Sequence, residues 1–197
     1  AAEGGSDDRL VNVLSGFAVS SQYNAEVLEG AESVGASIPE AFAITTYFGA
    51  SLTEALYGLQ YGAGNPSEQA YAEARELIRA SIYRDFEAWQ ANADLCRDHG
   101  VGMIAYEGGS HILATGYGDW DNERHASFMT FLANLHRHPY MKELYLEHWA
   151  LWCAAGGRTA SLFVDIGSWG YYGYWGAKED VTEPPDASPR WQAQSTF

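Results

Sequence analysis

Glu107 is the residue in this sequence whose position points most directly to chemistry. It follows an apolar run, residues 101–106, and it precedes Gly108 and Gly109. In a parallel α/β protein, ligands bind outside the carboxyl ends of the strands, so a carboxylate at such an end faces the ligand. Glycines allow a tight turn and leave room above the carboxylate. The structural alternative is a glutamate that pairs with an arginine or caps a neighbouring helix.

Two further residues are expected beside this carboxylate. Tyr47 lies at the end of an earlier apolar run, residues 41–48, in a place equivalent to that of Glu107. A phenol beside a carboxylate donates a hydrogen bond and keeps the carboxylate ionised and oriented. His111 follows Glu107 in the same loop and is suited to bond the ligand or the carboxylate. The alternatives are a core tyrosine and a structural histidine.

An aromatic, glycine-rich segment follows the last apolar run, residues 159–166. Flat aromatic faces next to carboxylates suit sugar rings, whose axial C–H groups stack on them. We expect Trp169, Tyr172 and Trp175 to contact such a substrate. A packed rim of aromatic side chains is the other interpretation.

Other chemical motifs are weak or missing. Asp119, Asp121 and Glu123 alternate, but the glycine of a calcium loop is lacking. His136 and His138 do not share a helical face and have no third ligand, so we expect them on the surface or at a helix cap. There is no GxSxG, no P-loop and no GxGxxG that opens a helix. We therefore predict no metal and no cofactor.

Length and composition predict one domain with a substantial core. The chain has 197 residues, of which 47% are hydrophobic. We expect residues 1–9 to be a flexible N-terminal segment and residues 181–197 to form a C-terminal tail. The net charge of −15 would repel a phosphate backbone, which argues against nucleic acid as a partner. No apolar run approaches the roughly 18 residues of a membrane span. The two cysteines form no CxxC motif, which excludes a zinc knuckle or disulfide scaffold.

The hydrophobic pattern predicts four buried strands that alternate with helices. We expect strands over residues 10–18, 41–48, 101–106 and 159–166, and helices over 21–31, 65–99, 123–136 and 139–155, with a loop at 50–64 and a short closing helix. This order predicts an α/β fold with a parallel sheet. Four such units amount to half of a (β/α)8 TIM barrel, which usually needs ~250 residues.

Three sequence segments carry a resemblance to a known family. IAYEGGSH, AITTYFG and SWGYYGYWGAKE are similar to the C-terminal half of barrel glycoside hydrolases, in the retaining clan with its acid/base after strand four and its nucleophile after strand seven. The resemblance implies that the four strands are strands five to eight. It also implies that Glu107 is the nucleophile, that Tyr47 is bonded to it, and that Trp169 or Trp175 floors the sugar subsite.

The sequence departs from this family at the acid/base. That glutamate, usually preceded by asparagine, belongs after strand four, whereas Asn122-Glu123 lies beyond the third strand of this chain. If the resemblance holds, the first half of the barrel is missing here, and the strand edges it leaves open tend to pair with another chain. We expect a complementary N-terminal half-barrel chain, or self-association, to close the barrel.

The sequence thus predicts a retaining glycoside hydrolase that acts on a carbohydrate. The alternative is a non-catalytic carbohydrate-binding or structural subunit with a degenerate barrel. A third interpretation, a complete flavodoxin-like domain, would want a glycine-rich phosphate loop after the first strand, and SGFAVSSQ is a poor substitute for one.

Overall fold

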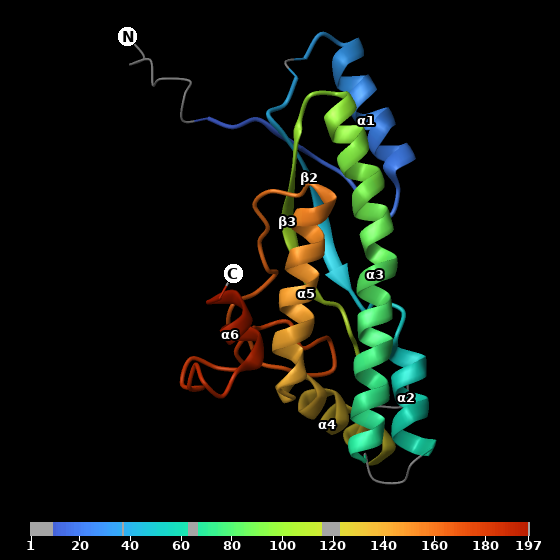
Figure 1. Cartoon of the computed structure of the whole chain (residues 1–197), viewed down its shortest axis with the longest axis vertical. Coiled ribbons are helices and arrows are strands. Elements are labelled where there is room, and N and C mark those ends of the chain that lie inside the picture. Colours follow the sequence, from blue (N-terminus) through green and yellow to red (C-terminus); the bar gives the residue numbers. More distant parts are fainter. Residues whose placement is uncertain (1–9, 37, 63–66, 116–122, 197) are drawn as a thin grey trace.

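The protein is a mixed α/β structure built on a three-stranded parallel sheet (Figure 1). The computed structural model describes residues 10–36, 38–62, 67–115 and 123–196. The strands are β1 (Val13–Ser15), β2 (Ala41–Phe48) and β3 (Gly102–Ser110), in that order across the sheet. The helices are α1 (Ser21–Ser33), α2 (Thr53–Gly62), α3 (Glu68–Asp98), α4 (Glu123–Arg137), α5 (Tyr140–Ala155) and α6 (Pro189–Gln194). The predicted N-terminal segment 1–9, and Asp119 and Asp121, lie outside the described residues.

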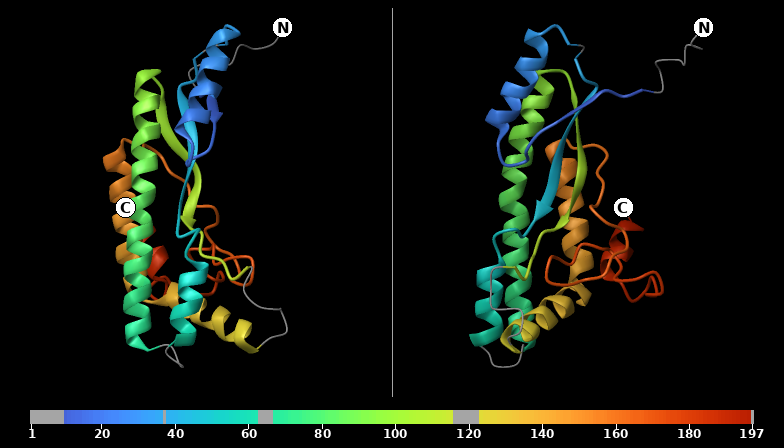
Figure 2. Two further views of the ribbon diagram at one scale, coloured as in Figure 1. Left: turned by 90° about the vertical axis from the view of Figure 1, so that its right-hand side faces the viewer. Right: turned by 180° about the vertical axis from the view of Figure 1, so that it is seen from behind.

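The helices beside the sheet cover one of its faces. Phe42 and Ile44 of β2 and Met103 of β3 are buried in a core with Trp89 of α3 and Trp152 of α5. Figure 2 shows α3 and α5 running along one side of the strands. A second core lies beyond the carboxyl ends of the strands, where α2, α4 and the first turns of α3 and α5 meet.

The opposite face of the sheet is more open. Neither α3 nor α5 lies on this side of the strands (Figure 2). Tyr106 is 45% exposed, and Ile104 and Thr45 are half-buried. Parallel sheets normally bury both faces, so this one-sided coverage is unusual for a parallel α/β protein.

Residues 158–163 run beside β3 without forming a regular strand. The backbone bonds between them are Arg158 N–H to Met103 O (2.9 Å), Ala105 N–H to Thr159 O (2.9 Å), Ser161 N–H to Ala105 O (3.1 Å) and Phe163 N–H to Gly108 O (3.2 Å). Only the pair Ala105 and Ala160 forms a parallel bridge. The predicted fourth strand over residues 159–166 is therefore not confirmed, because β3 carries an extra residue within this ladder.

The segment predicted as a loop at residues 50–64 was interpreted wrongly, because it contains helix α2. Leu52 and Leu56 are spaced by four residues and both are buried, so one face of the segment packs on the second core. The Thr53 hydroxyl donates to the Leu113 carbonyl (3.0 Å) at the start of this helix. Glycine and aromatic residues have a low helix propensity, so the segment did not look helical. Packing on the second core stabilises the helix in spite of this.

Helix α3 is continuous over its 31 residues. Its N-cap is Ser67, whose hydroxyl accepts from the Ala70 N–H, while residues 65 and 66 of the predicted helix lie outside the described residues. Within the helix, the buried Ser81 hydroxyl donates to the Ile78 carbonyl (2.7 Å), which satisfies it locally.

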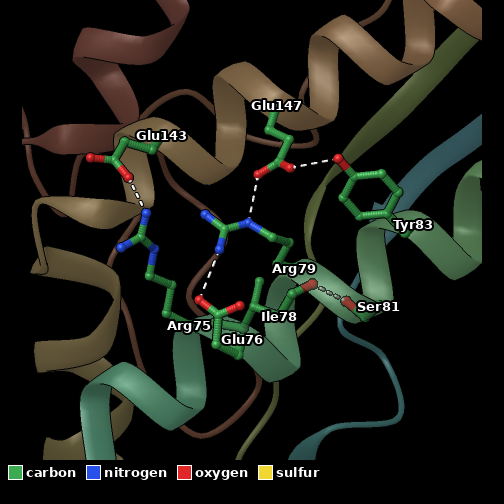
Figure 3. A network of polar contacts seen from close by, with 8 residues as sticks. All are labelled: Arg75, Glu76, Ile78, Arg79, Ser81, Tyr83, Glu143 and Glu147. Atoms are coloured by element: carbon green, nitrogen blue, oxygen red, sulfur yellow. Dashed lines mark hydrogen bonds and ion pairs between the residues drawn. The ribbon is translucent and has the colours of Figure 1, made fainter. Parts of the chain in front are cut away.

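Helices α3 and α5 are also joined on their outer surface by a polar network (Figure 3). Arg79 bonds to Glu147 of α5 (2.9 Å) and to Glu76 of its own helix (2.8 Å). Glu147 also accepts from the Tyr83 phenol (2.9 Å). Glu147 thus holds two side chains of α3, which fixes the two helices that support β2 and β3.

A buried histidine makes stability dependent on pH. His148 is fully buried, and neither of its ring nitrogens has a hydrogen-bond partner. The rings of Phe48, Trp89 and Trp149 lie 5.0, 5.0 and 4.7 Å from it. Burial lowers the pKa of His148 to about 3. The ring is therefore neutral in the folded protein.

We expect the free energy of unfolding to be highest above pH ~6.5, the pKa of histidine in an unfolded chain. Below it the unfolded state binds a proton that folded His148 resists, so stability falls by up to ~1.4 kcal/mol per pH unit toward pH 3. The substitution His148→Phe should make this decline less steep. Urea unfolding between pH 4 and 7.5 measures it, and equal slopes for the two proteins would contradict the prediction.

Candidate functional site

A β-bulge in β3 determines where the Glu107 side chain points. Ala43 and Ile44 pair with Ile104 and Ala105, but the next residue of β2, Thr45, pairs with Glu107. Tyr106 is the extra residue between these pairs. Bulges of this kind redirect a side chain.

The alternation of side chains along β2 and β3 shows how the bulge redirects Glu107. Side chains of a strand alternate between its faces, and Ile44 and Ala105 both belong to the core beneath the helices. Without the bulge, Glu107 would point the same way as Ala105, into that core. With it, Glu107 shares the face of Thr45 and Tyr47, which is the open one.

The glycines after Glu107 are required by this close pairing. A Cβ atom on Gly108 would lie 1.9 Å from the Thr46 hydroxyl oxygen, and Thr46 is completely buried. Gly109 has a φ of 107°, in the region that favours glycine. The segment EGG thus lets β3 leave the bulge while it remains in contact with β2.

The expected pair of Glu107 and Tyr47 is present. The Tyr47 phenol hydrogen-bonds to the Glu107 carboxylate, and its pKa is raised by burial and then by the charge of Glu107 and that bond. The phenol therefore stays protonated as a donor. No ion pair between described residues includes Glu107, so the alternative in which an arginine neutralises it has no support here.

The ring of Tyr47 belongs to a cluster of four rings beside Glu107. His111 lies edge-on to Tyr47 at 5.0 Å, and Trp175 lies 4.9 Å from His111 and 5.6 Å from Tyr47. Phe163 lies 5.3 Å from Trp175 and is 48% exposed. We define the aromatic cluster as Tyr47, His111, Phe163 and Trp175; all but Phe163 were candidate site residues, each for a separate role. The place of Phe163 within the run 159–166, beside β3, was the available signal.

The structure places Trp169 and Tyr172 differently from Trp175. Trp169 packs on the second core, with the Arg190 guanidinium 4.4 Å and the Arg137 guanidinium 5.2 Å from its ring centre. Tyr172 is 72% exposed, and its ring lies 5.1 Å from Tyr171. Of the three predicted aromatic contacts, Trp175 is the one that joins the aromatic cluster beside Glu107.

His136 is completely buried, so its expected surface position was wrong. One ring nitrogen bonds to the Leu132 carbonyl (2.7 Å) and the other to the Ser110 hydroxyl (3.0 Å). Burial lowers the pKa of His136 to about 3, which keeps the ring neutral. Ser110 is only 3% exposed, so this serine and histidine bind each other within the core and do not form an accessible nucleophile.

Metal and membrane features were also considered in the described part of the chain. Within residues 10–36, 38–62, 67–115 and 123–196, no cluster of three or more His, Cys, Asp or Glu side chains is arranged to hold a metal ion. No helix among these residues has both the length and the apolar character that crossing a bilayer requires.

Comparisons with known proteins were made for the whole chain. No family model, curated protein or solved structure matches it. The functional argument therefore depends on the geometry around Glu107.

We expect Gly108→Ala to destabilise the protein by about 1–3 kcal/mol, because the new methyl group would overlap the Thr46 hydroxyl. Gly30→Ala is the matched control. Gly30 lies in the exposed part of α1 with open space at its Cβ position, so alanine should stabilise the protein by ~0.5–1 kcal/mol.

Thermal unfolding of the two variants measures the difference. Thr46→Ala in the Gly108→Ala background should restore part of the loss. If Gly108→Ala is as stable as Gly30→Ala, the close approach of the two strands is not as described.

Proposed function

We propose that this chain carries the nucleophile of a retaining glycoside hydrolase. The observation that supports this most is the Glu107 carboxylate itself: it has no cationic partner among the described residues, it is bonded by Tyr47, and the aromatic cluster flanks it on the open face of the sheet. Carboxylate and aromatic rings together suit a sugar at the carboxyl edge of parallel strands.

In the proposed reaction, one Glu107 oxygen attacks the anomeric carbon. The glycosidic C–O bond breaks, a second carboxyl group protonates the leaving oxygen, and a covalent glycosyl-enzyme forms. Water, deprotonated by that second group, then attacks the anomeric carbon and releases Glu107. The two carboxyl groups of such enzymes lie ~5–5.5 Å apart. The chemistry needs no cofactor.

Tyr47 has a defined part in both steps. Its protonated phenol holds one oxygen of Glu107, so the other is oriented for attack. The same hydrogen bond stabilises the carboxylate when it leaves in the second step. Trp175 and the half-exposed Phe163 offer apolar faces for the sugar, and His111 supports both Tyr47 and Trp175 by edge contacts.

The second carboxyl group is proposed to come from outside this chain. We infer that the parallel units are the C-terminal half of a TIM barrel, which a complementary N-terminal half or a second copy completes. One-sided helix coverage supports this, because a closed barrel keeps its helices outside and buries the other face. The outer edge of β1 supports it too, since Val13 is 45% exposed there.

We expect Glu107→Gln to abolish hydrolysis of aryl glycosides, because an amide is a far weaker nucleophile than a carboxylate. Tyr47→Phe should lower kcat by ~10–100-fold through the loss of one bond to a charged group. The control is Glu87→Gln, on the exposed surface of α3. A panel of aryl glycosides measures these rates, and turnover by Glu107→Gln equal to that of Glu87→Gln rejects the nucleophile.

The alternative function is sugar binding without turnover by a degenerate barrel. The sequence favours it in one respect, because Asn122-Glu123 does not lie where the resembled family carries its acid/base. In that case the wild-type chain binds oligosaccharide in calorimetry but releases no product, binding survives Glu107→Gln, and Trp175→Ala removes it.

Association is tested separately. The chain is expected to sediment as a species larger than 21.6 kDa, and Val13→Lys, at the sheet edge, should weaken that association. Val181→Lys is the control, since Val181 is exposed in the C-terminal tail. A monomer whose outer amides on β1 and residues 158–163 resist hydrogen exchange would contradict closure by any partner.

A further inference from the structure

Arg190 is a completely buried cation whose two terminal nitrogens donate to backbone carbonyls. One terminal nitrogen donates to the Tyr174 carbonyl and the other to the Gly176 carbonyl. These two residues stand on either side of Trp175. The planar guanidinium thus bridges the peptide groups that carry the tryptophan of the aromatic cluster.

The guanidinium is itself held from two directions. The Trp169 ring lies 4.4 Å from it, and the Trp169 indole N–H donates to the same Gly176 carbonyl (3.2 Å). The Tyr145 phenol hydrogen-bonds to Arg190 and also accepts from the Ser110 N–H (3.0 Å). Since Ser110 ends β3, a continuous set of bonds joins the strand of Glu107 to the segment of Trp175.

Trp175 depends on such support because its own segment has no regular structure. Residues 167–176 contain no helix or strand, only isolated bridges. The indole N–H of Trp175 donates to the Tyr172 carbonyl (3.0 Å), so the ring folds back over its own chain. Gly173 permits this, because a Cβ atom there would lie 2.2 Å from the Trp175 ring nitrogen.

We propose that Arg190 is a positioning residue for the sugar site. By holding the Tyr174 and Gly176 carbonyls it fixes the backbone of Trp175, and so keeps the indole against Tyr47 beside Glu107. The effect of Arg190 on sugar binding or hydrolysis rests on the proposed function, whereas its effect on the position of Trp175 does not. Only arginine fits this role, because its rigid planar fork reaches two carbonyls at once and a lysine ammonium is a single point of charge.

The test compares Arg190→Lys with Arg137→Met. Arg137 lies over the same Trp169 ring, at 5.2 Å, but it is partly exposed and pairs with Glu179. Its loss removes a cation from that ring without touching the carbonyls beside Trp175. Each variant is made in the wild-type and the Trp175→Phe backgrounds, so that the signal of Trp175 is obtained by difference.

The first measurement is spectroscopic and needs no substrate. The near-ultraviolet circular dichroism and acrylamide quenching of Trp175 should change strongly in Arg190→Lys and stay nearly unchanged in Arg137→Met, at equal helix content. A Trp175 signal in Arg190→Lys that matches that of Arg137→Met overturns the proposal. If Arg190→Lys does not fold, Tyr145→Phe, which removes the phenol bond to Arg190, is measured in the same way. An unchanged Trp175 signal in that variant also overturns it.

The second measurement is sugar binding or hydrolysis. Arg190→Lys should weaken kcat/KM or affinity by about tenfold or more, as small displacements in a site do. It should add no further loss when Trp175 is already phenylalanine. Equal losses in both backgrounds would make Arg190 merely structural. A wild-type chain without binding or turnover counts against the proposed function, and the spectroscopic measurement still decides the role of Arg190.

Discussion

The sheet of this protein is parallel, and its own helices cover it on one side. Parallel strands are stable when both faces are shielded from water, and here only the face of Phe42, Ile44 and Met103 meets a helical core. The other face carries few large side chains and leaves Tyr106 half-exposed. This asymmetry decides toward which side the Glu107 carboxylate is directed and which surface of the sheet the helices α3 and α5 leave uncovered.

The support for the site comes from the covered side. The long helix α3 and helix α5 are joined to each other by Glu147 on the outside and by aromatic packing inside (Figure 3). The two strands that bear Tyr47 and Glu107 rest on this pair of helices. The segment that carries Trp175 has no regular structure, and the buried Arg190 side chain of α6 holds it by its carbonyls. A rigid layer thus presents residues that come from three distant parts of the sequence.

The sequence predicted the parts of this arrangement that follow from local pattern. The run 41–48 is apolar and β-branched, and it forms β2 with the same bounds. Glu107 and Tyr47 could be placed together because neighbouring parallel strands end at one edge of a sheet. That Glu107 acts as a nucleophile, and that the sheet is half of a TIM barrel, remain proposals.

Features that depend on tertiary contacts were not predictable. Helix α2 is stabilised by the core that Leu56 enters, and the ladder beside β3 is interrupted by an extra residue that no composition rule reveals. His136 is buried because Ser110 and a carbonyl satisfy both of its nitrogens. Arg190 looks like an ordinary tail residue until its carbonyl partners, fourteen and sixteen residues earlier, are seen.

The bulge at Tyr106 has a genetic consequence. Removal of that single codon would place Glu107 directly after Ala105, and since neighbouring residues of a regular strand point to opposite faces, the carboxylate would stay beside Thr45 on the open face. A codon inserted into β2 between Ile44 and Thr45 would also remove the bulge, but it would pair the new residue with Tyr106 and turn Glu107 to the side of Ala105, among apolar side chains. A carboxylate there would be neutralised or would unfold the strand. A sequence comparison that scores the motif around Glu107 and ignores such an insertion in β2 would still count the glutamate as present.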